Sequence, residues 1–371
     1  MTTNDSITTN NVHSLTVECT FMGEEGNPFL APRGVIMHGN TLVVSDTGQN
    51  RIFIWNDFKG GPYQKADLVL GQPETAATER NAGAQVSGQS LQYPAGIWTN
   101  GQLLIVADAW NHRVLIWHQM PTHTGQTADV VVGQPDLRRN EPNVRGIGKS
   151  PTAQTLYWPY GVWSDGKSLW IADTGNRRVL FYKSIPQQHY TAADAVIGQQ
   201  NFEEKDYDSN HAVWPYSVKL SPQGALAIAD TQYYRVLLWQ DWQTAFIQQA
   251  DLVIGQPDMA SNGQNQFGLK PAAHTLNWCY DCCFYKDGMA VADTGNSRIL
   301  QWNSVPLMNN TAADYLLGQT RFDINGESSL NLQTNLTHEM YWPFAINTCG
   351  EKLVIADTGN HRILIAKQKT S

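Results

Sequence analysis

Short apolar stretches alternate with polar turns along the whole chain, and residues 158–199 show the pattern most clearly. These stretches are rich in β-branched and aromatic residues and are bounded by Gly, Asp, Asn and Ser, which is typical of short β-strands joined by turns. We expect four strands here, over 158–163, 169–172, 178–182 and 194–199. The pattern therefore predicts a unit of four strands.

The same unit occurs six times. The turn after its second strand carries an aspartate with an arginine five residues later, and the aspartates are Asp46, Asp108, Asp173, Asp230, Asp293 and Asp357. Neighbouring aspartates are 62, 65, 57, 63 and 64 residues apart. Such a regular spacing indicates one structural unit repeated along the chain. Six units of four short strands predict an all-β fold, a six-bladed β-propeller.

The two ends of the chain are expected to share one blade. The sixth unit ends after its third strand, over 363–366, whereas residues 15–21 form a strand pattern with no unit of their own. If this N-terminal strand completes the last blade, it closes the ring and removes an open sheet edge. The expected organisation is a disordered tail over 1–11 and a single propeller domain over 12–371.

The repeated segment resembles the NHL repeat. Its pattern is Asp-Thr-Gly-Asn-x-Arg followed by Ile or Val and then Leu, after an apolar strand and Pro-x-Gly-Val. The six copies cover nearly the whole chain. The fourth copy departs from the pattern over 232–234, and the fifth has Cys279 in place of the proline. The resemblance implies a six-bladed propeller, in a family that includes protein- and RNA-binding propellers and a few enzymes such as the peptidylglycine amidating lyase.

Composition narrows the choice of partners. Charged residues make up 16% of the chain and the formal net charge is -8, which disfavours nucleic acid as a partner. No apolar run approaches the roughly 20 residues of a membrane span, and the N-terminus has no secretion-signal pattern. The odd number of cysteines, five, does not suggest a disulfide framework. We therefore expect a soluble cytoplasmic protein with no membrane partner.

The repeated aspartates and arginines are predicted to be structural. Each occupies the same position in every unit, where the aspartate can hold the turn and the arginine can pair within or between sheets. A function is more readily expected where the units differ.

One position differs informatively from unit to unit. It directly follows the proline that begins the first strand, and its six residues are Arg33, Ala95, Tyr160, Tyr216, Tyr280 and Phe344. These strands begin on the same face as the connections between units, which span 17 to 26 residues and are long enough to suggest binding. The pattern predicts a ligand site at the mouth of the central channel.

The chemistry of this predicted mouth is mixed. Tyr160, Tyr216, Tyr280 and Phe344 would form apolar walls with hydroxyl tips. Arg33 could hold a carboxylate, and Asp281, which follows Tyr280, could hold an amine or act as a base. The alternative is that these aromatic side chains simply fill the channel.

A single divalent metal is a further hypothesis. His274 and His338 stand five residues before the proline position of the fifth and sixth units, and Asp281 could be a third ligand. Hydrogen bonding is the alternative role of this pair. In the amidating lyase the zinc histidines stand at the position after the proline, where this chain has none.

The segment Cys279-Tyr280-Asp281-Cys282-Cys283 is unusual among the first strands. Strict alternation predicts that Cys279, Asp281 and Cys283 share one face and that Cys282 lies on the other. We expect Cys282 and Cys283 to be buried in the core. Cys279, at the mouth, is a candidate ligand contact, or a thiol nucleophile with His274 as its base.

Three functions follow from these observations. The favoured one is a module that binds a small polar ligand or a protein partner at the mouth. The second is a lyase or hydrolase, with or without a metal, that uses Tyr280, Asp281 and Arg33 as catalytic residues. The third is a pure interaction scaffold with a filled channel.

Overall fold

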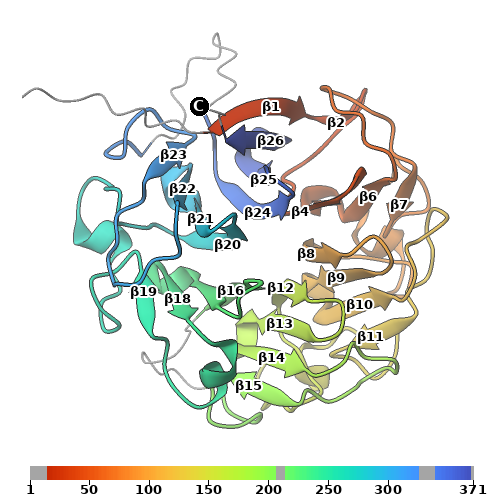
Figure 1. The fold of residues 1–371 in the computed structure, drawn as a ribbon. Coiled ribbons are helices and arrows are strands. Elements are labelled where there is room, and N and C mark those ends of the chain that lie inside the picture. The colour runs from red at the N-terminus through yellow and green to blue at the C-terminus, as the bar shows by residue number, and fades with distance from the viewer. Residues whose placement is uncertain (1–14, 206–213, 326–338, 369–371) are drawn as a thin grey trace, which may run out of the picture.

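The computed structural model describes residues 15–205, 214–325 and 339–368. Six four-stranded antiparallel sheets surround a central axis, and Figure 1 shows their first strands innermost. The predicted all-β, six-bladed propeller is therefore confirmed. The tail predicted over 1–11 lies outside the described residues. No helix in the described ranges is long and apolar enough to cross a membrane.

The first three blades follow the chain in order. Blade 1 contains β4 (Gly34–His38), β5 (Thr41–Asp46), β6 (Arg51–Trp55) and β7 (Leu68–Leu70). Blade 2 contains β8 (Pro94–Thr99), β9 (Leu104–Asp108), β10 (Arg113–Trp117) and β11 (Val130–Val132). Blade 3 contains β12 (Pro159–Ser164), β13 (Leu169–Asp173), β14 (Arg178–Tyr182) and β15 (Ala195–Ile197).

The last three blades complete the ring. Blade 4 contains β16 (Pro215–Leu220), β17 (Leu226–Asp230), β18 (Arg235–Trp239) and β19 (Leu252–Ile254). Blade 5 contains β20 (Cys279–Tyr285), β21 (Gly288–Asp293), β22 (Arg298–Trp302) and β23 (Tyr315–Leu317). Blade 6 contains β24 (Pro343–Cys349), β25 (Lys352–Asp357), β26 (Arg362–Gln368) and β1 (Leu15–Phe21).

Short elements occupy the connections. A small hairpin joins β2 (Gly23–Glu24) and β3 (Asn27–Pro28). The turn after each second strand is a 3-10 turn: η1 (Thr47–Gln49), η3 (Ala109–Asn111), η5 (Thr174–Asn176), η6 (Thr231–Tyr233), η9 (Thr294–Asn296) and η10 (Thr358–Asn360). Longer connections carry η2 (Arg80–Gly83), η4 (Pro142–Val144), η7 (Trp242–Phe246) and η8 (Gln264–Phe267).

The ring closes through the N-terminal strand, as predicted. β1 pairs with β26, with Phe21 opposite Ile363, and Figure 1 shows β1 and β26 side by side in one blade. Phe21 is fully buried and its ring contacts the rings of Phe29, Trp55 and Phe58. Closure therefore combines strand pairing with apolar packing.

The hydrophobic core lies between neighbouring blades. Leu70 of blade 1, for example, belongs to one buried cluster with Leu104 and Val131 of blade 2. Each sheet thus buries both faces, which explains why the second and third strands are apolar nearly throughout.

The repeated aspartate and arginine stabilise each blade, as predicted. In blade 3, Arg178 Nε donates to Asp173 Oδ2 at 2.8 Å, and the arginine also donates to the carbonyls of Phe202, Thr152 and Thr155. The Nε–Oδ2 distance is 2.6–2.9 Å in all six blades. The pair is buried, and it fixes the long connections to the sheet.

The threonine after the repeated aspartate joins neighbouring blades, which the sequence analysis did not predict. Thr174 Oγ1 donates to the carbonyl of Pro215 in the next blade at 2.6 Å. The same bond links Thr358 of blade 6 to Pro32 at the start of blade 1. Blade 2 has Ala109 instead.

Candidate ligand site at the channel mouth

The aromatic residues predicted at the mouth are placed by β-bulges. The pairing of β12 with β13 shifts between Pro159 and Gly161, which leaves Tyr160 as an extra, unpaired residue. The same shift occurs at Tyr216, Tyr280 and Phe344. A bulge turns a side chain away from the sheet alternation. These four residues therefore leave the sheet packing and gather at the axis.

Their rings form a continuous arc, which we call the aromatic arc (Tyr160, Tyr216, Tyr280 and Phe344). Tyr160 and Tyr216 are stacked with their centroids 4.5 Å apart, and Tyr216 meets Tyr280 edge to face at 4.5 Å. Tyr280 and Phe344 follow at 4.2 Å. The structure thus brings together the four aromatic residues that the sequence singled out.

Arg33 completes the ring around the axis. Its guanidinium carbon lies 3.8 Å from the centroid of Phe344 and 5.1 Å from that of Tyr93, and Nη1 donates to the Tyr216 hydroxyl at 3.5 Å. Arg33 is half-buried. Among the described residues, no carboxylate lies within 4.0 Å of it. Within the described ranges, the neighbours of this cation are therefore neutral.

A second layer of aromatic residues surrounds the arc. Tyr93 stacks on Trp110 at 4.6 Å, and Trp110 Nε1 donates to the Tyr160 hydroxyl at 3.3 Å. Burial raises the pKa of Tyr160 to about 12, so the phenol is protonated at neutral pH. Trp110, Trp278 and Trp342 remain 39%, 45% and 40% exposed. The rim of the mouth is therefore apolar and open.

Several rim residues have a strained backbone. The residues before the proline position have positive φ values near 50° in five blades: Ala31, Tyr93, Trp158, Trp278 and Trp342. This region is unfavourable for large side chains and for a residue that precedes proline. Side chains of the preceding blade hold the strained amides; for example, His112 Nδ1 accepts from the Trp158 amide at 3.2 Å. Such strain often occurs at functional sites.

Below the arc, a buried ion pair joins the first strands of blades 4 and 5. Lys219 Nζ lies 3.3 Å from Asp281 Oδ1, which also accepts from the Cys282 amide, while Oδ2 accepts from the Ile346 amide. The remaining cavity is about 30 Å³, room for about one water molecule. Both Asp281 oxygens are thus engaged within the fold, and its role as base or amine ligand stays a prediction.

Lys219 was missed by the sequence analysis. The signal was available, because it stands three residues after the ring position, where the other blades have Ile36, Trp98, Trp163, Cys283 and Asn347. A lysine in an innermost strand needs a partner, and Asp281 is the only acidic residue in the first strands of the six blades.

The side chains of the cysteines in β20 do not follow the strict alternation of faces that we expected. Cys279 and Cys282 belong to the same core cluster, whereas Cys283 belongs to the next one. The prediction that Cys279 and Cys282 face opposite sides is wrong, because the bulge at Tyr280 resets the alternation. Cys282 and Cys283 are buried, as expected.

Cys279 has no access to the mouth. It is fully buried and its thiol donates to the Arg235 carbonyl at 3.1 Å. Burial raises the pKa of this thiol well above its usual value. A nucleophilic cysteine needs a lowered pKa and exposure, so this environment supports packing rather than catalysis.

The proposed metal pair is described only in part. His274 is half-buried, and His338 lies outside the described residues. Within the described ranges, no group of three His, Cys, Asp or Glu side chains is arranged to hold a metal ion. The pair therefore stays a prediction.

Comparison with known proteins gives distant likenesses. No family model and no curated protein matches this chain. Virginiamycin B lyase from Staphylococcus aureus shares 11% identity with a TM-score of 0.46, covering 95% of this chain and 98% of that chain. Hydrazine synthase from Kuenenia stuttgartiensis shares 14% at 0.46, covering 92% and 77%. The computationally designed protein Ika8 shares 8% at 0.40, covering 91% and 70%. None of these likenesses supports an argument about the site.

Proposed function

We propose that this chain is an NHL-type propeller that binds a small ligand with a carboxylate and a flat apolar part at its channel mouth. The observation that carries the proposal is that Arg33 has no anionic partner among the described residues. A half-buried guanidinium without such a partner is costly, and a planar carboxylate would supply two charge-assisted hydrogen bonds.

The aromatic arc supports the second part of this proposal. Its rings offer flat apolar surface on either side of the arginine, and burial raises the pKa values of Tyr160 and Tyr280, so their hydroxyls are protonated donors at neutral pH. Since the cavity below holds about one water molecule, the ligand lies on the arc and does not enter the channel.

A protein partner is the second candidate. Trp110, Trp278 and Trp342 are partly exposed around the arc, and tryptophan is enriched where protein interfaces carry their binding energy. A partner would place an acidic side chain or a C-terminal carboxylate on Arg33. The cytoplasm is the compartment we propose for either function.

Titration calorimetry with benzoate and indole-3-acetate tests this proposal, with the corresponding neutral amides as comparison ligands. We expect the carboxylates to bind at least about tenfold more tightly than their amides, since the amide lacks the charge that Arg33 recognises. Arg33→Gln removes this preference. Arg138→Gln, an exposed arginine in the connection between blades 2 and 3, leaves it unchanged. Equal affinity for acid and amide in the unmodified protein contradicts the proposal.

A further inference from the structure

Blades 3 and 4 depart from the repeat where they meet on the face opposite the mouth. Trp170 in β13 stands three residues before the repeated aspartate, where the other blades have Val43, Ile105, Ala227, Ala290 and Val354. The connection after β18 adds η7, which begins with Trp242. Because the other blades form the same sheet without a tryptophan at the position of Trp170, the propeller scaffold itself does not require one there.

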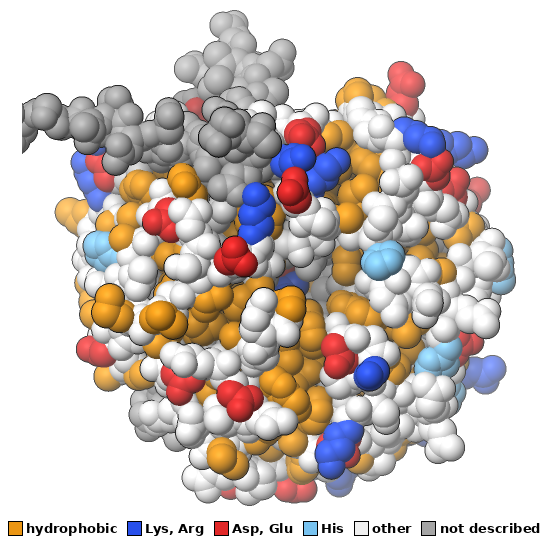
Figure 2. Space-filling view, viewed as in Figure 1, with side chains coloured by type: hydrophobic (Ala, Val, Ile, Leu, Met, Phe, Trp, Pro, Cys, Tyr) orange, Lys and Arg blue, Asp and Glu red, His pale blue; other side chains and the backbone are white. Residues whose placement is uncertain are grey.

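Trp170 and Trp242 both line one cavity, which we call the tryptophan pocket. It has a volume of about 360 Å³ and is lined by Trp163, Trp170 and Trp242, by Asp165 and Ser168, and by part of the segment 220–224. This volume lies within the range of small-molecule sites. Figure 2 shows a band of hydrophobic side chains that passes over the strands β12–β14 of blade 3.

The indoles form a corner in this pocket. Trp163 pairs with Trp170 across β12 and β13, so both stand on the same face of the sheet. Trp242 stands perpendicular to Trp170, with an interplanar angle of 87° and centroids 5.5 Å apart. Trp163 and Trp242 are only half-buried and both line the cavity, so indole surface stays open to it. An indole face is the side-chain surface that attracts an organic cation most strongly.

Trp170 also has an unused hydrogen-bond donor. Its side chain is fully buried, and its Nε1 has no partner among the described residues. Four other buried tryptophans each donate to a carbonyl nine residues later in the chain: Trp55, Trp117, Trp239 and Trp302. A buried donor without an acceptor is unfavourable, so an acceptor on a ligand would be favoured here.

The charge at the rim favours a cation. Asp165 is exposed, and the amides of Ser168 and Lys167 donate to its Oδ1 at 2.7 and 2.9 Å. Partial burial raises the pKa of this carboxyl, but these hydrogen bonds outweigh it, so the net effect lowers the pKa. The described residues that line the pocket include no lysine or arginine. Its fixed charge is therefore negative.

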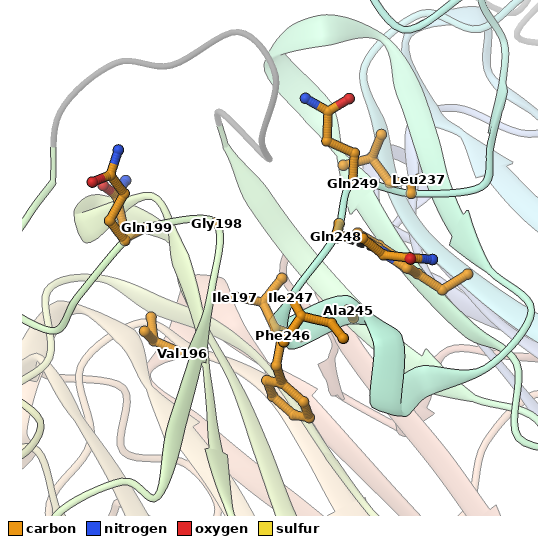
Figure 3. A pocket seen from close by; sticks show the side chains of 13 residues that line it. Val196, Ile197, Gly198, Gln199, Leu237, Ala245, Phe246, Ile247, Gln248 and Gln249 are labelled. Carbon is orange, nitrogen blue, oxygen red and sulfur yellow. Dashed lines mark hydrogen bonds between the residues drawn. The ribbon is translucent and has the colours of Figure 1, made fainter.

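A neighbouring pocket provides a contrast. It has a volume of about 290 Å³ and lies between β15 and residues 245–250, and Figure 3 shows Val196, Ile197, Phe246 and Ile247 around it. Phe246 stacks on Trp170 at 5.8 Å and so separates the two pockets. Among the described residues, the lining of this second pocket has no charged side chain, and we assign it no ligand.

We propose that the tryptophan pocket binds a small alkylammonium cation that carries an oxygen acceptor, a compound of the choline class. The alkylammonium group would contact the indole faces near Asp165, and the oxygen would accept the hydrogen bond of Trp170. This site is separate from the mouth and does not depend on the function proposed there.

Titration with choline, followed by tryptophan fluorescence and calorimetry, tests this inference. 3,3-Dimethylbutan-1-ol has carbon in place of the charged nitrogen, so its affinity compared with that of choline measures the effect of the charge. Tetramethylammonium lacks the hydroxyl group, so the same comparison measures the effect of the oxygen acceptor. We expect choline to bind at least about tenfold more tightly than the neutral alcohol, and more tightly than tetramethylammonium. Equal binding of choline and the alcohol, or no binding of choline at millimolar concentration, overturns the proposal.

Two variants test whether choline binds in the tryptophan pocket. Asp165→Asn and Trp242→Leu should each weaken choline binding about tenfold, and both keep the buried Trp170 in place. Trp98→Leu is the matched control, because Trp98 is also half-buried and occupies in blade 2 the position of Trp163. If Trp98→Leu weakens binding as much as Trp242→Leu does, the effect is not local to the pocket and the assignment is wrong.

Discussion

The guanidinium of Arg33 lies 3.8 Å from the centre of the Phe344 ring, and these residues belong to the first and last blades. Arg178, by contrast, is fully buried with Asp173 at 2.8 Å and donates to three backbone carbonyls. One arginine serves the fold through an internal ion pair. The other is held among aromatic rings with its charge available to a ligand.

This difference predicts that replacing arginine by methionine lowers stability strongly at position 178 and only slightly at position 33. Arg178→Met should lower the free energy of unfolding by about 3–5 kcal/mol, because it leaves the buried Asp173 without its partner. Arg33→Met should change it by less than about 1 kcal/mol, because the lost cation–π contacts are offset by removal of an unpaired charge. Urea unfolding of both variants measures the two costs. A loss above about 3 kcal/mol for Arg33→Met would mean that this arginine, too, is structural.

The fold could be predicted from the sequence because the same pattern of strands and turns occurs six times. The Asp–Arg spacing occurs in each unit, and the strand pattern of 15–21 accounts for the strand missing from the sixth blade. The identity of the ring positions could also be predicted, since they are counted from the proline. Both predictions rest on the repeat, which can be recognised in a single sequence.

What could not be predicted depends on contacts across blades. The bulge at Tyr280 is invisible to strict alternation, so the faces of Cys279 and Cys282 were assigned wrongly. Lys219 and Asp281 are 62 residues apart and meet only when blades 4 and 5 pack side by side. The tryptophan pocket likewise combines β13 with η7, which are brought together by blade packing and not by sequence proximity.

Close approach of the inner strands predicts that Gly161 does not tolerate a side chain. A Cβ at this position would lie 2.5 Å from the Tyr216 carbonyl oxygen, which belongs to the neighbouring strand backbone. Gly161→Ala should therefore cost about 1–3 kcal/mol of stability, because backbone atoms must shift. Thermal and urea unfolding would measure this cost. Gly148→Ala is the control, since a Cβ there meets no atom within 4 Å, and a similar loss in both variants would contradict the steric explanation.

His112 predicts a pH dependence of stability. Burial lowers its pKa from 6.5 to about 4, and its Nδ1 accepts from the Trp158 amide, which requires the neutral ring. The unfolded state therefore binds a proton more readily than the folded state does. Stability from this group is fully present above pH 6.5 and is lost as the pH falls towards 4.

His112→Asn tests this sign. Asparagine keeps an acceptor, as Asn50 does for the Tyr93 amide in blade 1, but it does not titrate. The loss of stability between about pH 7.5 and pH 5 should be about 2 kcal/mol smaller in the variant than in the unmodified protein. Urea unfolding at both pH values measures the difference, with the exposed His123→Asn as control. An unchanged pH dependence in His112→Asn would show that the ring is not held neutral.

Closure of the ring predicts a large effect at its N-terminal strand. Phe21 is fully buried and contacts three aromatic rings of the neighbouring blade 1 region, so Phe21→Ala should cost about 3–5 kcal/mol. Thr16→Ala, an exposed residue of the same strand, should cost less than about 0.5 kcal/mol. Because β1 also covers the edge of β26, partial detachment of the strand should expose that edge to other chains. Light scattering during mild heating should therefore rise earlier for Phe21→Ala than for Thr16→Ala, and coincident curves would mean that closure does not depend on this side chain.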